Sequence, residues 1–142
     1  MYILDTNVIS ELRKAKKTHP NVKKWAEALP SASLYISVIS VLELEIGILL
    51  VDQRDKDRRD KEQGAILRAW MDRRVLPTFS GRILSIDTAV AQRCATLHVP
   101  NPCSDRDALV AATALVHGLT VATRNVADFE RTGVGVINPW EA

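Results

Sequence analysis

Residues 2–9 read Tyr-Ile-Leu-Asp-Thr-Asn-Val-Ile, and this opening passage changes abruptly from apolar to polar residues after position 4. Apolar residues then recur at helical spacing, at positions 8, 9 and 12. The passage therefore predicts a buried strand over residues 2–4 that runs directly into a helix, with Asp5 and Asn7 at the helix entrance. A strand that feeds a helix in this way is typical of α/β proteins.

The rest of the chain repeats this alternation of short apolar runs and helical patterns. No Asn-Gly or Asp-Gly hairpin signal separates the runs, so neighbouring strands are expected to be parallel. The pattern predicts one α/β domain over residues 1–142, with a central, mostly parallel sheet of about five strands and helices on both faces. Beyond the first strand, strands are expected at residues 34–36, 82–87, 119–123 and 134–137, and helices at residues 20–29, 41–50, 65–76, 88–98 and 104–117.

Residues 52–62 hold five acidic and five basic side chains and little else. Oppositely charged residues recur four positions apart, which favours an exposed helix with a solvated, charged face rather than a functional patch. The pairs are Asp52/Lys56, Asp55/Arg59 and Asp57/Lys61.

The bulk composition narrows the class of protein without naming a function. Hydrophobic residues make up 46% and charged residues 25% of the chain, and the formal net charge is only +2, too small to argue for nucleic-acid binding. Cys94 and Cys103 lack a zinc-type spacing, so a metal site with His98 has little support and a reducing compartment is expected. No basic leader or long apolar span is visible, so the protein is expected in the cytoplasm and away from membranes.

Asp5 is the first acid that surface charge does not easily explain. It follows an apolar strand directly, and in parallel sheets ligands gather at the carboxyl ends of the strands. Asp5 and Asn7 occupy such a place, so they are candidates for binding a ligand. The alternative is that Asp5 only caps the following helix, and the pattern leaves both interpretations open.

Two further acids are candidates, each with a competing neighbour. Glu43 lies near the start of an apolar helix, but Glu45 lies about 200° further round it, so the two cannot share one face. Asp105 and Asp107 both fall in the first turn of another helix, where negative charge is favourable in any case. The residue pattern does not choose within either pair.

The last candidates follow the strand at residues 119–123. Asn125 or Asp128 could reach a cation, while Thr123 or Arg124 could hold a phosphate oxygen. An acid in a turn after a strand is also ordinary, so Asp128 by itself is weak evidence.

Together these positions predict several carboxylates that meet at one edge of the sheet. Such carboxylates repel one another, and a divalent cation with oxygen ligands, either Mg²⁺ or Mn²⁺, relieves the repulsion. If Asp5, Glu43 and Asp107 are assigned to the metal, the remaining charge is +2 − (−3) = +5, which suits a polyanionic substrate. The chemistry that this predicts is phosphodiester hydrolysis.

At these residues the sequence resembles the PIN-domain family and, within it, the VapC-type toxins of bacterial toxin–antitoxin pairs. The resemblance runs in order along essentially the whole chain, and its specificity comes from the ordered set rather than from any one motif. The matching pieces are residues 3–11, 40–44, 81–84, 107–114, 118–129 and 138–140.

The resemblance implies a toxic, Mg²⁺-dependent endoribonuclease in which Asp5, Glu43 and Asp107 are the principal metal-binding acids. It thereby favours Glu43 over Glu45 and Asp107 over Asp105. The family's variable fourth acidic position falls on Asn125, which brings an oxygen ligand but no charge, and Asp128 could compensate. The resemblance also implies cleavage of RNA, inhibition by a VapB-type antitoxin, and a homodimer.

Three rival functions remain on the sequence. A PIN-type nuclease could act on DNA or in RNA maturation instead of as a toxin. A catalytically silent PIN domain could serve as an RNA- or protein-binding module, although all three principal acids are present. An aspartyl phosphatase is disfavoured because Asn7 stands where its second aspartate is expected.

Overall fold

The computed structural model describes residues 1–54 and 58–142, which form an α/β domain around a five-stranded parallel sheet. The sheet has the order β3-β2-β1-β4-β5, and every neighbouring pair is parallel. This confirms the predicted fold class. The strands are β1 (Tyr2–Leu4), β2 (Leu34–Ser37), β3 (Ile83–Leu84), β4 (Thr120–Ala122) and β5 (Val136–Ile137).

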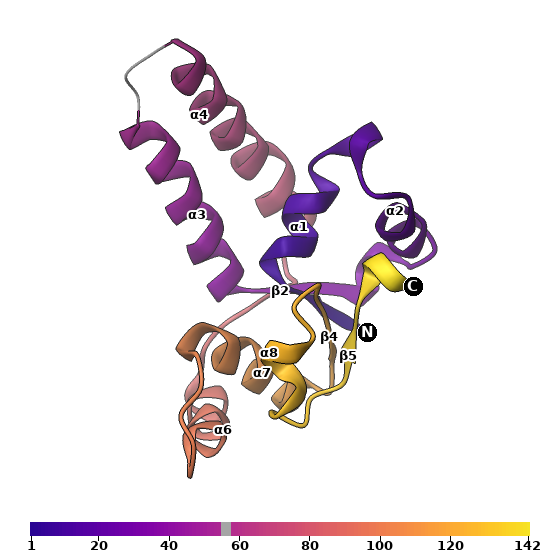
Figure 1. Cartoon of the computed structure of the whole chain (residues 1–142), viewed down its shortest axis with the longest axis vertical. Coiled ribbons are helices and arrows are strands. Elements are labelled where there is room, and N and C mark those ends of the chain that lie inside the picture. Colours follow the sequence, from indigo (N-terminus) through magenta and orange to yellow (C-terminus); the bar gives the residue numbers. More distant parts are fainter. Residues whose placement is uncertain (55–57) are drawn as a thin grey trace.

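Helices cover both faces of the sheet (Figure 1). Helices α1 to α4 lie on one side, where α3 and α4 pack together as a long projecting hairpin, and α6 to α8 lie on the other. The helices are α1 (Thr6–Leu12), α2 (Pro20–Glu27), α3 (Val38–Gln53), α4 (Arg58–Trp70), α5 (Leu76–Thr78), α6 (Thr88–His98), α7 (Asp105–His117) and α8 (Ala127–Glu130). Shorter turns are η1 (Ala15–Lys17), η2 (Ser31–Ser33), the π-helical η3 (Met71–Val75) and η4 (Pro139–Glu141).

Each strand contributes alternate side chains to two separate cores, as expected for a sheet covered on both faces. Leu4 of β1 packs in the core beneath α1 and α3, whereas its neighbour Ile3 packs in the core beneath α7. Phe129 of α8 is fully buried in the second core. None of the described helices has the length and apolar character needed to cross a membrane.

The predicted extent of the third strand, residues 82–87, is wrong. Only Ile83 and Leu84 pair, and their partners in β2 are Ile36 and Ser37. Ser37 ends β2 because its side chain accepts a hydrogen bond from the Ile39 backbone and caps α3, so nothing is left for residues 85–87 to pair with. Asp87 instead caps α6.

The other boundaries differ less. Helix α2 ends at Glu27. Helix α7 ends at His117, and Gly118, whose backbone is left-handed (φ 67°), caps it as predicted. Within residues 52–62, α3 ends at Gln53 and α4 begins at Arg58. The expected pairs Asp52/Lys56, Asp55/Arg59 and Asp57/Lys61 each include a residue outside the described residues or a side chain that is not described.

The strand order of the sheet reverses beside β1. The chain moves outward from β1 through β2 to β3, and then crosses back to β4 and β5 on the other side of β1. In open parallel sheets, ligands bind outside the carboxyl ends of the strands where this reversal occurs. In this chain the reversal lies between Asp5, which follows β1, and Thr123, which follows β4.

Candidate functional site

Asp5 both caps a helix and stands at the sheet edge. Its Oδ1 accepts a hydrogen bond from the Thr6 backbone N–H at 2.9 Å, and its Oδ2 accepts one from the Thr123 hydroxyl at 2.8 Å. Only 7% of Asp5 is exposed. Burial raises the pKa of its carboxyl, and the nearby charges of Glu43 and Asp128 raise the pKa further, against the hydrogen bonds from Thr123 and Thr6. Asp5 thus caps α1 and is also a buried acid at the carboxyl end of β1, so capping does not exclude a role in binding a ligand.

Asn7 and Thr123 join the ends of β1 and β4. The Asn7 amide lies 3.4 Å from Asp5 Oδ2 and 3.3 Å from Thr123 Oγ1, and its carbonyl oxygen accepts a hydrogen bond from the Arg124 backbone N–H at 3.3 Å. The Thr123 hydroxyl also accepts from the Asn125 backbone N–H at 3.0 Å. Because Thr123 is fully buried and its hydroxyl is bonded to Asp5, this residue orients the carboxylate from within the protein.

Glu43 lies beside Asp5, whereas Glu45 does not. Glu43 Oε1 accepts a hydrogen bond at 2.9 Å from the hydroxyl of Thr6, the residue whose backbone N–H binds Asp5. Glu45 makes a two-pronged ion pair with Arg68 of α4, at 3.0 and 2.7 Å, and the Arg68 hydrogen bonds lower the pKa of Glu45. Of the two glutamates, Glu43 is the one placed near the sheet edge.

Asp107 and Asp105 point to different surroundings as well. The pKa of Asp107 is raised to about 6, most of all by burial and then by the charges of Asp5, Asp128 and Glu43 in that order. The Asp105 side chain is 91% exposed and lies 3.6 Å from the His98 ring nitrogen Nε2. Asp107 therefore faces the other acids, and Asp105 faces solvent.

Asp128, Asn125 and Arg124 complete the set of sequence candidates. Asp128 on α8 is close enough to raise the pKa of both Asp5 and Asp107, so it belongs to the same cluster. The backbone N–H of Asn125 donates its hydrogen bond to the Thr123 hydroxyl. The Arg124 guanidinium is exposed and stacks over the Trp140 ring at 5.2 Å from its centroid, at the rim of the same edge.

Four acids from separate parts of the chain thus share one electrostatic environment: Asp5, Glu43, Asp107 and Asp128, here called the acid cluster. Mutual repulsion and burial oppose the ionised forms of Asp5 and Asp107, and a divalent cation would relieve both. The oxygen-only donor set suits Mg²⁺ or Mn²⁺.

The fit of a cation depends on how many carboxylates it needs. Within residues 1–54 and 58–142, no group of three or more acids, histidines or cysteines is arranged to hold one ion directly. Mg²⁺, however, keeps several waters and is commonly bound through one or two carboxylates plus substrate phosphate. Asp5 and Asp107 fit that requirement best, because Asp5 is the largest charge acting on the pKa of Asp107.

Two residues of the site were not singled out from the sequence. Thr6 bridges Asp5 and Glu43 through its backbone and its hydroxyl, and that hydroxyl also lies 3.1 Å from Ser40 Oγ. Arg106 places Nη1 3.8 Å from Glu43 Oε2. The available signal for Arg106 was its position, since a cation in the first turn of a helix opposes the helix dipole.

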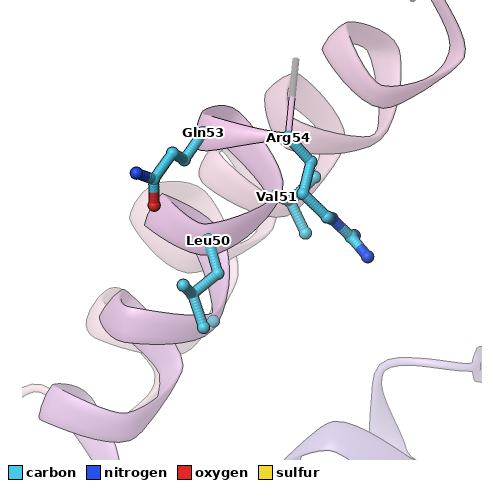
Figure 2. A pocket seen from close by; sticks show the side chains of 5 residues that line it. Leu50, Val51, Gln53 and Arg54 are labelled. Carbon is cyan, nitrogen blue, oxygen red and sulfur yellow. The ribbon is translucent and has the colours of Figure 1, made fainter. Parts of the chain in front are cut away.

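A separate surface pocket lies near the end of α3 (Figure 2). Its lining includes Leu50, Val51 and Arg54, together with Gly47 and Gln53. No member of the acid cluster lines it.

Comparison with known proteins gives consistent matches over the length of the chain. The family model described as "PIN domain" matches residues 2–135. The chain is 39% identical to "Plasmid stability protein StbB" of Pseudomonas syringae pv. tomato, with all of both chains covered. It is 36% identical to "VapC ribonuclease Y4jK" of Sinorhizobium fredii, with 99% of each covered.

Solved structures with the same fold include complexes. The chain superposes on the crystal structure of FitAcB from Neisseria gonorrhoeae with a TM-score of 0.86 and 34% identity, covering 100% of both chains. It also matches a toxin–antitoxin complex from Klebsiella pneumoniae with a TM-score of 0.66 and 27% identity, covering 98% of each chain.

Proposed function

The chain belongs to the PIN-domain family, in its VapC-type branch, and from this we propose that it is a toxic, Mg²⁺-dependent endoribonuclease of a toxin–antitoxin pair. The observation that carries the proposal is that Asp5, Glu43, Asp107 and Asp128 act on one another electrostatically near the place where the strand order reverses, between β1 and β4. The first three are the principal acids that the resemblance implies, and Asp128 is the residue that could compensate for Asn125 at the fourth position. All of residues 1–142 would act as one unit.

We assign the metal to Asp5 and Asp107 as direct ligands. Glu43 and Asp128 would act through water or by moving closer, and the Asn125 side chain could add a neutral oxygen. When bound, such an ion supplies positive charge to the scissile phosphate and lowers the pKa of a water molecule that attacks phosphorus. Thr123 and Thr6 hold the Asp5 carboxylate in one orientation through their hydrogen bonds.

The substrate would approach along the edge of the sheet at which β1 and β4 end. Asn7 is tied to the Arg124 backbone, and Arg124 presents an exposed guanidinium stacked on Trp140. A guanidinium pairs well with phosphate oxygens, and the charge that remains after three acids are assigned to metal is +5, which favours a polyanion. RNA is the polyanion named for the relative called a ribonuclease.

The purified chain is expected to cleave RNA only with a divalent cation. EDTA should abolish cleavage and excess Mg²⁺ or Mn²⁺ should restore it, because the acids alone repel the phosphate. The measurement is gel analysis of a structured RNA beside single-stranded DNA of the same sequence. Cleavage of DNA alone would make the chain a DNA nuclease. RNA binding without cleavage at any metal concentration would support the catalytically silent module instead.

We also propose a protein antitoxin as partner and a homodimeric toxin. Leu42, Leu49 and Leu50 of α3 lie on one helical face and are 45%, 58% and 55% exposed, and Leu50 also lines the pocket of Figure 2. Exposed leucines gathered on one helix favour a protein interface there. The match to a toxin–antitoxin complex supports an antitoxin as the partner that covers it.

Co-expression with the cognate antitoxin, to be sought as a small open reading frame beside this gene, is expected to suppress toxicity. The two proteins should co-purify as a complex that light scattering shows to contain two copies of this chain. Leu49→Glu with Leu50→Glu should release the partner, because two charges would be buried without counter-ions. Val116→Glu, at an apolar position 40% exposed on α7, is the matched control and should keep it. Retention of the partner by the α3 variant would exclude α3 from the interface, and release by both variants would point to a general defect of folding.

The place of action that we propose is the cytoplasm, where cellular RNA is made and translated. Cys94 and Cys103 are both free thiols, as is usual in a reducing compartment.

A further inference from the structure

Arg106 stands in an electrostatically unfavourable place for its own helix. It lies in the first turn of α7, between Asp105 and Asp107. The positive end of the helix dipole favours acids there and disfavours cations. An acid of another helix lies beside Arg106 and offsets this unfavourable placement.

That interaction is with Glu43 of the acid cluster. Arg106 Nη1 lies 3.8 Å from Glu43 Oε2, a distance that fits an ion pair but is too long for a hydrogen bond. Half of the Arg106 side chain and 30% of the Glu43 side chain are exposed, so solvent screens the pair. The other Glu43 oxygen is held more closely, by the Thr6 hydroxyl at 2.9 Å. One oxygen of Glu43 is thus fixed, and the other faces a cation that can leave.

We propose that Arg106 is an exchangeable counter-ion of the acid cluster, which neutralises Glu43 in the metal-free protein and moves to an RNA phosphate once a metal ion is bound. This inference rests on the proposed function. A divalent ion beside Asp5 and Asp107 supplies the charge that Glu43 otherwise takes from Arg106. An RNA phosphate then offers the guanidinium a two-pronged acceptor at the same edge of the sheet. Arg106 is a substrate-positioning residue in this account.

The first half of the proposal is tested without RNA, by Mn²⁺ titration calorimetry on the wild-type chain and on Arg106→Gln. Removing the guanidinium charge is expected to strengthen Mn²⁺ binding by about three- to tenfold. At a solvated site, one like charge near the ion weakens its binding constant by about tenfold or less. Arg68→Gln is the matched control, since Arg68 pairs with the distant Glu45, and its Mn²⁺ affinity should equal that of the wild type. Equal affinity in Arg106→Gln would overturn the counter-ion role.

The second half is tested by steady-state kinetics on RNA at saturating Mg²⁺. Arg106→Gln is expected to raise KM by about tenfold with kcat within about threefold, because one charge-assisted contact to phosphate is lost. Arg106→Lys keeps the charge but not the two-pronged geometry, so its KM should lie between those of the wild type and Arg106→Gln. An unchanged KM would overturn the move to phosphate. If the wild-type chain cleaves no RNA, the proposed function fails while the Mn²⁺ titration still decides the counter-ion role.

Discussion

Asp5→Asn is expected to lower metal-dependent RNA cleavage by about a thousandfold or more, since a metal ion contributes several kcal/mol of charge stabilisation to phosphoryl transfer. The substitution removes the charge that binds the ion and leaves the side-chain volume nearly unchanged. The fold should persist, because an asparagine oxygen can still accept the hydrogen bond of the Thr6 N–H that begins α1. Thermal melting of the metal-free variant should match or exceed that of the wild type, since burial already disfavours the ionised Asp5.

Glu45→Gln is the matched control for this experiment. Glu45 is also an acid near the start of α3, but it pairs with Arg68 of α4 and not with the acid cluster. Its loss is expected to leave cleavage within about twofold of the wild type, because exposed ion pairs contribute little. Metal-dependent cleavage that survives in Asp5→Asn would contradict the assignment of this residue, and an equal loss in both variants would point to a general defect of folding.

Asp107→Asn is expected to separate stability from activity. The Asp107 carboxyl has a pKa of about 6 in the folded protein and an ordinary value of 3.8. The folded state therefore binds this proton more tightly than the unfolded state does, so protonation of Asp107 stabilises the metal-free fold. That contribution is complete below about pH 4 and is lost as the pH rises through about 6. Removing the charge should raise the melting temperature near pH 7 and abolish cleavage.

Thermal melts in EDTA between pH 4.5 and 8 measure this effect. The difference in melting temperature between Asp107→Asn and the wild type should be largest at pH 7 to 8 and should shrink as the pH falls below about 6. Wild-type cleavage in limiting Mg²⁺ should decline over the same range, because protons compete with the ion for the carboxylate. A pH-independent difference in melting temperature would show that Asp107 is not the group responsible.

The first strand and the acid that follows it illustrate what a pattern of residues can predict. Tyr2–Leu4 followed at once by Asp5 predicted a buried strand with an acid at its carboxyl end, and the structure has both. The apolar runs at β2, β4 and β5 likewise predicted their strands, because a strand buried on both faces must be apolar along its length. The extent of β3 was overestimated because a strand at the edge of a sheet ends where its single neighbour ends.

The choice within each pair of acids needed partners that are distant in the sequence. Periodicity shows that Glu43 and Glu45 point away from α3 in different directions. It cannot show that Thr6 binds Glu43 and that Arg68 binds Glu45. The resemblance to VapC-type toxins favoured Glu43 and Asp107, and the structure places these two with the acid cluster. Arg106 could not be identified from the sequence, because its role depends on an ion pair with Glu43, a residue of another helix.

Local patterns of apolar and polar residues thus determined the elements of this protein, the parallel sheet, and the acids at the ends of its strands, because backbone periodicity and burial act over a few neighbouring residues. Only the tertiary structure decided which acids share one environment, which side chains orient them and which cation stands beside them. Electrostatic interactions depend on distance through space, and the sequence records distance only along the chain.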